Sequence, residues 1–165
     1  MTTTDNVALP TGNGVIAGAL YTLGPIYING SALPGVTGVK FMANCNVESF
    51  SSDGDLYGTW QTVMTRSPRF EITLKDATVL NDFGIGGVAQ GATASKIFLR
   101  KYSKGASRVA DATAEHIKFT MNASQGMVWP GTVSGGNDGL EGTLILQPIK
   151  GSSDQITIST GVAIS

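Results

Sequence analysis

The chain has 165 residues, enough for one domain with a hydrophobic core and short for two. Eleven basic and twelve acidic residues give a formal net charge of -1 without any Lys/Arg-rich run, which argues against tight nucleic-acid binding. Only 14% of the residues are charged, whereas 22 are glycine, and Ser, Thr and Asn are frequent. This composition disfavours a long helical bundle and favours short strands joined by turns.

The first 18 residues are rich in Thr, Gly and Asn, and predict a flexible N-terminal arm before a single domain over residues 19–165. They contain no basic stretch followed by an apolar core, so we expect no secretory signal. No run approaches the roughly 18 apolar residues that span a bilayer. We therefore expect a chain made in a cytoplasm that does not insert into a membrane.

In the first half of the domain, the sequence predicts two strands followed by a long connection. A strand over Tyr21–Ile28 ends at the turn signal Asn29-Gly30. A second strand over Val39–Phe50 alternates, which predicts a half-buried strand with Cys45 in the core. Its apolar face carries Phe41, Ala43, Cys45 and Val47, and its polar face carries Lys40, Asn44, Asn46 and Glu48.

The connection over Ser51–Ser67 is too apolar for a simple solvated loop. Its large apolar residues are Leu56, Tyr57, Trp60, Val63 and Met64. Such residues indicate either an extension of a hairpin or a loop that docks on a neighbouring subunit.

One strand and one helix follow this connection. Phe70, Ile72 and Leu74 alternate with polar residues, which predicts a strand. Lys75–Gly84 is the best helix candidate, because Asp76 can cap it and Gly84 can end it. Its apolar residues Val79, Leu80 and Phe83 share one face.

The remaining sequence predicts a glycine-rich loop over residues 85–95 and then strands only. These are Lys96–Ser103, a strand after His116 with Ile117, Phe119 and Met121 inward, two strands around the turn GGNDG, and a last strand containing Ile156, Ile158, Val162 and Ile164. About eight strands and one short helix favour a mainly β fold, an antiparallel sandwich or barrel.

A search for catalytic or ligand-binding groups finds almost none. His116 is the only histidine; alternation places it on a polar face, as a solvated or interface residue, and no serine lies in a G-x-S-x-G setting. Asp53-Gly54-Asp55 lacks the other ligands of a calcium loop. Gly12–Gly18 and Gly84–Gly87 lack the strand-to-helix setting of a phosphate loop. We expect no catalytic, cofactor-binding or metal-binding residues, and no enzymatic activity.

Two other sets of residues give little support for a functional site. Glu71 and Asp76 straddle a strand end and a helix cap, so nothing places them across a shared cleft. The lone Cys45 has no intramolecular disulfide partner and lacks the company of a zinc site.

The order of these elements resembles the phage major tail tube proteins of long-tailed phages. The likeness runs from about residue 20 to 164: IYINGSALPGVTGVKFMANCNVESF, a long loop, PRFEITLKDATVLNDFG as a strand into a lone helix, and strands ending in LEGTLILQPI and QITIST. The resemblance implies a β-sandwich with a flanking helix, assembled into hexameric rings that stack into a tube for DNA ejection.

The resemblance also implies partners and surfaces. The chain would bind copies of itself, tape-measure protein and tail-tip or terminator proteins, and DNA would pass transiently through the tube. Ser51–Ser67 would reach an adjacent subunit or ring, and residues 1–18 would serve in stacking. Candidate lumen residues are Lys40, Asn44, Asn46, Glu48, Glu71 and Thr73. The protein would lie in the virion tail after assembly in the bacterial host cytoplasm.

Two alternatives remain open. One is another virion part, such as a tail terminator or a capsid decoration protein. The other is a carbohydrate-binding or adhesin module that uses Tyr57, Trp60 and Trp129.

Overall fold

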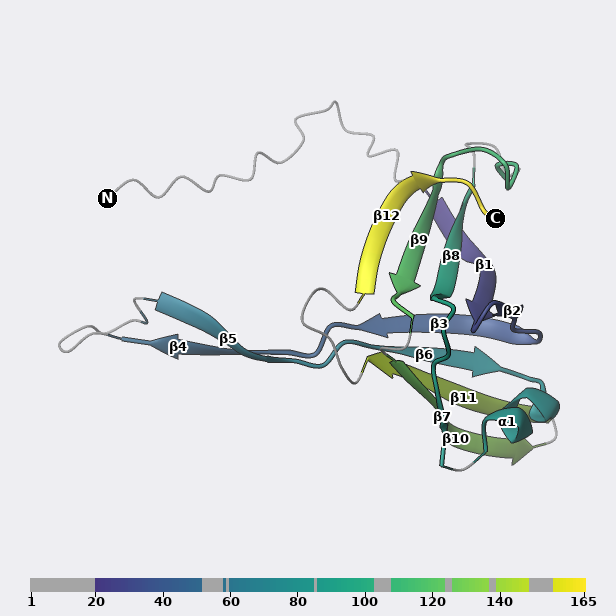
Figure 1. Ribbon diagram of the computed structural model, residues 1–165, viewed down its shortest axis with the longest axis horizontal. Helices are drawn as coiled ribbons and strands as arrows, with labels where there is room; N and C mark the ends of the chain where they lie inside the picture. Colours follow the sequence, from purple (N-terminus) through teal and green to yellow (C-terminus); the bar gives the residue numbers. More distant parts are fainter. Residues whose placement is uncertain are drawn as a thin grey trace.

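The computed structural model describes residues 20–51, 58, 60–84, 86–102, 108–123, 126–136, 139–148 and 156–165. These residues form two five-stranded antiparallel sheets, a separate two-stranded ribbon and one short helix (Figure 1). The expected fold class, mainly β with antiparallel sheets and one short helix, is confirmed. The predicted arm over residues 1–18 lies outside the described residues.

The first sheet, called the β8 sheet after its central strand, is antiparallel throughout. Its order is β12 (Ile156–Val162), β9 (His116–Met121), β8 (Ser95–Tyr102), β1 (Leu20–Ile28) and β2 (Ser31–Ala32). The turn between β1 and β2 is Asn29-Gly30, and both residues have positive φ, 53° and 83°. This left-handed pair is the geometry of a tight hairpin, as the sequence predicts.

The second sheet, called the β11 sheet, lies below the first, and its strands cross those of the β8 sheet (Figure 1). Its order is β3 (Val36–Met42), β6 (Arg69–Leu74), β11 (Gly139–Pro148), β10 (Gly126–Gly136) and β7 (Val88–Ala89). β7 falls inside the stretch predicted as a loop. Two residues of strand are too few for a recognisable alternation.

The hydrophobic core lies between the two sheets. β6 alternates strictly between half-buried and buried positions, so every second side chain enters the core. The fully or nearly fully buried apolar residues include Ile26, Ile97 and Met121 from the β8 sheet and Phe70, Ile72, Leu74, Val128, Leu144 and Leu146 from the β11 sheet. Burial of these side chains holds the two sheets together.

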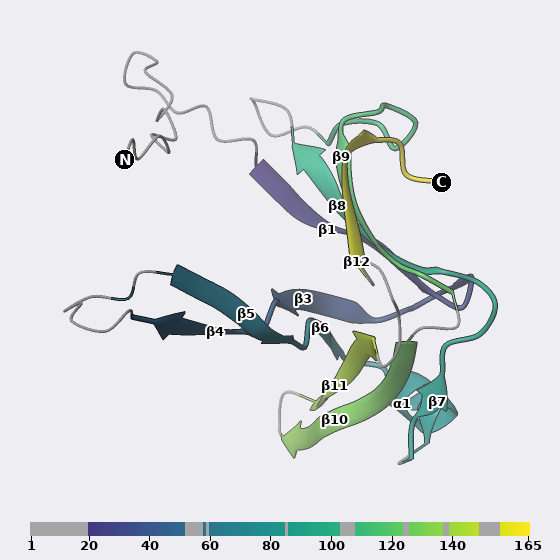
Figure 2. The same cartoon turned by 60° about the vertical axis from the view of Figure 1, so that its left-hand side comes forward.

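The helix α1 (Ala77–Phe83) covers one end of the β11 sheet (Figure 2). Its buried Val79 and Leu80 belong to the core, and Phe83 packs against them from a half-buried position. Gly84 follows with φ of 58°, the left-handed conformation that ends many helices. The predicted helix and the face it buries are confirmed.

The ribbon is the part of the fold that differs most from the sequence prediction. Its strands, β4 (Cys45–Phe50) and β5 (Trp60–Arg66), pair only with each other in the described chain and project away from both sheets (Figures 1 and 2). The predicted single strand over Val39–Phe50 is therefore wrong. It divides into β3 and β4 because Asn44 has φ of 44°, which breaks the extended backbone.

Two short connections, here called the neck, join the ribbon to the β11 sheet. Ala43-Asn44 links β3 to β4, and Ser67-Pro68 links β5 to β6. Of the two readings of Ser51–Ser67, the hairpin extension is the one that the structure has. The described part contains twelve strands against about eight expected, because the long strand divides, β5 occupies much of the predicted loop, and β2 and β7 are very short.

Candidate functional site

His116 does not lie on a solvated surface, so that prediction is wrong. Its side chain is 0% exposed at the start of β9. Nε2 lies 3.0 Å from the carbonyl oxygen of Ala110, and Nδ1 accepts a hydrogen bond of 3.1 Å from the backbone N–H of Lys101. Alternation alone placed this side chain outward, but residues 108–115 fold over that face of the β8 sheet and bury it.

The other candidate chemical groups stay apart. Glu71 accepts a hydrogen bond of 3.0 Å from Arg69 in the middle of a strand, whereas Asp76 precedes α1. Gly84 follows the C-terminal end of α1, where the helix dipole disfavours an anion. Asp53-Gly54-Asp55 and Gly12–Gly18 lie outside the described residues. Among the residues described, His, Cys, Asp and Glu form no group of three that could hold a metal ion.

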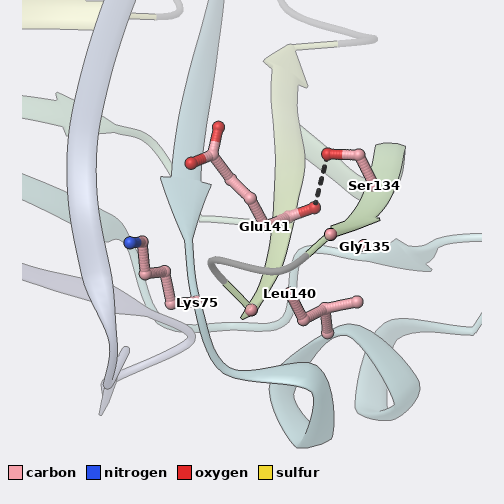
Figure 3. Close-up of a pocket in the computed structure, with 7 residues that line it drawn as sticks. Lys75, Ser134, Gly135, Leu140 and Glu141 are labelled. Atoms are coloured by element: carbon pink, nitrogen blue, oxygen red, sulfur yellow. Dashed lines mark hydrogen bonds between the residues drawn. The ribbon is translucent and has the colours of Figure 1, made fainter.

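A shallow pocket of about 260 Å³ lies at the hairpin end of β10 and β11 (Figure 3). It is lined by Lys75, Ser134, Gly135, Gly136, Gly139, Leu140 and Glu141. The hydroxyl of Ser134 donates to the backbone carbonyl of Glu141 at 3.5 Å. A backbone carbonyl cannot take the proton of a nucleophile, and the only histidine lies on the other sheet. The hydrogen bond of Ser134 therefore does not pair this hydroxyl with a side-chain base.

Three of the seven large apolar side chains that are exposed among the described residues lie on the two strands of the ribbon. Val47 is 49% exposed, Val63 43% and Met64 51%. Val47 and Val63 are direct partners across β4 and β5, so they share one face, and the register shifts next to them, between Asn46 and Val47. Of the other predicted loop residues, Trp60 begins β5, while Leu56 and Tyr57 lie outside the described residues.

Cys45 lies at the base of this ribbon and is exposed, not in the core as predicted. Its register partner is Arg66. The alternation that placed Cys45 in the core with Phe41 is real, but the neck carries β4 beyond the other sheet, and nothing in the described chain covers it there.

The predicted lumen residues fall into two groups. Lys40 and Glu71 are direct partners across β3 and β6, and Thr73 lies two residues further on the same face of the β11 sheet, the face turned away from the core. Asn44 lies in the neck, and Asn46 and Glu48 lie on the ribbon. The structure thus brings three of the six together and separates the other three.

Sequence reasoning missed several residues that share this outer face. Ile145 is the partner of both Glu71 and Trp129, and Thr143 is the partner of Thr73. The alternation in LEGTLILQP contained this signal, because Leu144 and Leu146 point into the core and their neighbours must point out. The outer face is therefore mixed, with polar and charged groups around half-buried apolar ones.

The two tryptophans of the carbohydrate-binding alternative lie on different sheets. Trp129 is half-buried in β10, and Trp60 begins β5 of the ribbon. Their backbone positions therefore belong to separate parts of the described fold.

No family model, curated protein or solved structure matches the chain. The helix among the described residues, seven residues long, is not long and apolar enough to cross a membrane.

Proposed function

We propose that this chain is a structural subunit that assembles with copies of itself, as the subunit of a phage tail tube. The observation that carries the proposal is the ribbon of β4 and β5. An isolated two-stranded ribbon is at best marginally stable in water, and this one exposes Val47, Val63 and Met64. A subunit of a larger assembly gains the missing packing from its neighbour.

The edges of the sheets support the same proposal. β3 and β12 lie at sheet edges, and β12, with the sequence ITISTGV, has neither a charged residue nor proline to block pairing. Monomeric proteins usually protect such edges, because unpaired backbone groups invite another strand. Pairing of edges between subunits would close a ring, one of six subunits by the resemblance described above, and contacts through the ribbon would stack rings without limit.

The outer face of the β11 sheet suits the wall of a DNA conduit. Glu71 is paired with two cations, Lys40 across β3 and β6 and Arg69 at 3.0 Å, and Thr73 adds a neutral polar group. DNA that must slide should be held weakly, so a wall without a basic stripe fits the electrostatics of phosphate binding. On this proposal tape-measure and tail-tip or terminator proteins meet the ends of the tube, and the protein lies in the virion tail.

The test is the assembly state of the purified full chain. Size-exclusion chromatography with light scattering, followed by negative-stain electron microscopy, should show rings and tubes that become more abundant with protein concentration. Single rings that never stack would favour a tail terminator. A monomer at every concentration, also in the presence of the tail-tip proteins of its own phage, would reject the tail-tube assignment.

A further inference from the structure

His116 is the centre of a hydrogen-bonded latch that holds the segment Arg108–Glu115 on the end of the β8 sheet. The carbonyl oxygen of Ala110 can only accept, so Nε2 of His116 carries the proton and donates at 3.0 Å. The backbone N–H of Lys101 can only donate, so Nδ1 must present a lone pair at 3.1 Å. The arrangement therefore requires the neutral ring with its proton on Nε2.

Further bonds fasten the same segment. Arg100 binds both carboxylate oxygens of Asp111, at 2.9 and 2.7 Å, and the Nζ of Lys101 lies 2.7 Å from Glu115. The N–H of Val109 donates to the carbonyl of Lys101 at 3.1 Å. The N–H of Ile164 donates to the carbonyl of Asp111 at 2.8 Å, so the C-terminal residues after β12 are fastened to the same segment.

Protonation of the ring is incompatible with this arrangement. A proton on Nδ1 would point at the N–H of Lys101, which is itself a donor, and the side chain is 0% exposed, so no water can relieve the conflict. The ring can bind a second proton without this donor–donor conflict only after the segment has opened. Acid therefore favours the open segment.

The charged and titratable groups around the ring do not remove this conflict. From β8 they are Arg100, Lys101 and Tyr102, and from β1 Tyr21. From the segment they are Arg108, Asp111 and Glu115, and from β9 itself Lys118, whereas β12 has none. The two carboxylates are already paired with Arg100 and Lys101. Lys104 lies outside the residues that the structure describes.

We propose that His116 makes this segment a proton-sensitive latch: mild acid shifts the equilibrium toward opening of Arg108–Glu115 and the C-terminal residues that it holds, while the two sheets stay folded. The device is independent of the assembly proposed above. Hydrogen bonds from Arg100 and Lys101 hold the pKa values of Asp111 and Glu115 below their usual range, so both carboxylates stay charged between pH 5 and 7.

The sign and size of the effect follow from linkage. A histidine free in water binds its proton near pH 6.5, so if only the open state takes the proton, the opening equilibrium rises about tenfold at pH 5.5 and about a hundredfold at pH 4.5. The closed segment is most stable above that pH, and its stability falls as the pH falls.

The experiment is amide hydrogen exchange followed by NMR on the full chain, corrected for the intrinsic pH dependence of exchange. Between pH 7.5 and 5.5 the protection of the Lys101, Val109 and Ile164 amides should fall about tenfold. The amide of Lys75, which binds the carbonyl of Gly35 at 2.9 Å on the other sheet, is the internal control and should not change. Equal protection of the latch amides at both pH values would overturn the proposal.

Two variants cannot titrate, and each keeps one bond of the ring. His116→Asn keeps an acceptor for the N–H of Lys101, and His116→Gln keeps a donor for the carbonyl of Ala110. In either variant the pH step should disappear, whereas Asp111→Asn should retain it from a lower starting protection. A step that persists in a non-titrating variant would refute the latch.

A second readout covers the case in which neither His116 variant folds. Because the chain has a single histidine, its ring nitrogen signals in the wild-type protein are unambiguous. They should report the Nε2–H tautomer at neutral pH, and uptake of the second proton should coincide with loss of protection. Proton uptake by the ring while the segment stays protected would contradict the proposal.

Discussion

Asn44 and Ser67 bind each other twice across the neck of the ribbon. The N–H of Ser67 donates to the carbonyl of Asn44 at 3.1 Å, and the side-chain amide of Asn44 donates to the carbonyl of Ser67 at 3.0 Å. The hydroxyl of Ser67 also accepts a bond of 2.7 Å from Gln147 on β11. These bonds fix the point where the ribbon leaves the β11 sheet.

Asn44 is therefore the residue at which substitution should loosen the ribbon. Asn44→Val removes the side-chain bond and places a β-branched residue at φ of 44°, a conformation that costs about 1–3 kcal/mol. Asn44→Gly loses the bond but tolerates the backbone, so it should cost less. Chemical denaturation should rank the variants in this order, with Asn46→Val on β4 as the control near wild type. If the Asn44→Val variant were as stable as the Asn44→Gly variant, backbone strain at position 44 would be excluded.

Leu80 should be a principal anchor of α1. The side chain of Leu80 occupies the space beside Gly142, so tightly that a Cβ added at Gly142 would collide with it. Leu80→Ala should destabilise the fold by about 2–5 kcal/mol in urea unfolding. Asn81→Ala, at the next and exposed position, should change stability little.

The contact between Leu80 and Gly142 predicts that the stability effects of substitutions at these two positions are coupled. Gly142→Ala alone should destabilise because its Cβ meets Leu80, but in the Leu80→Ala background the added methyl group fills part of the cavity. The double variant should lose less stability than the two single losses combined. Strict additivity would mean that α1 shifts away from β11 instead.

Assembly should depend on the apolar face of the ribbon. Val63→Glu places a charge in the contact that we propose between subunits, so rings and tubes should be lost in electron micrographs while the fold is kept. Gln61→Glu adds the same charge to the same face of β5, two residues earlier, without removing apolar surface, and should assemble better. If both variants assemble like wild type, the ribbon does not form the contact.

Strong acid should weaken the Arg108–Glu115 segment by a second route. The hydrogen bonds from Arg100 to Asp111 and from Lys101 to Glu115 lower both carboxyl pKa values. These pairs therefore stabilise the fold above the ordinary carboxyl range, near pH 4, and the stabilisation is lost as the pH falls through the lowered values. Asp111→Asn should flatten the acid side of a pH and stability curve below pH 4, and an unchanged curve would show that the pair is fully screened.

The sequence predicted those features whose causes are local. The alternation of Phe70, Ile72 and Leu74, the positive-φ turn at Asn29-Gly30 and the buried face of α1 each depend on a few neighbouring residues. The prediction failed where burial depends on distant segments. Cys45 belongs to an alternating pattern but lies beyond the sheet that could cover it, and His116 faces outward until residues 108–115 close over it.

The six predicted lumen residues divide in the same way, into three that alternation places correctly and three that it does not. Lys40, Glu71 and Thr73 share a face because strand register follows from alternation once the partners are known. Asn44, Asn46 and Glu48 leave that face because a single left-handed residue redirects the chain, and a period of two contains no sign of such a turn.

The neck also determines how the ribbon behaves mechanically. β3 runs into β4 and β5 runs into β6 through two residues each, and β3 and β6 are themselves neighbours in the β11 sheet. The ribbon is thus a lever whose two strands both continue into the sheet. A displacement of its outer part is carried through the two connections into β3 and β6, so that movement of a neighbour at the ribbon reaches the body of the molecule.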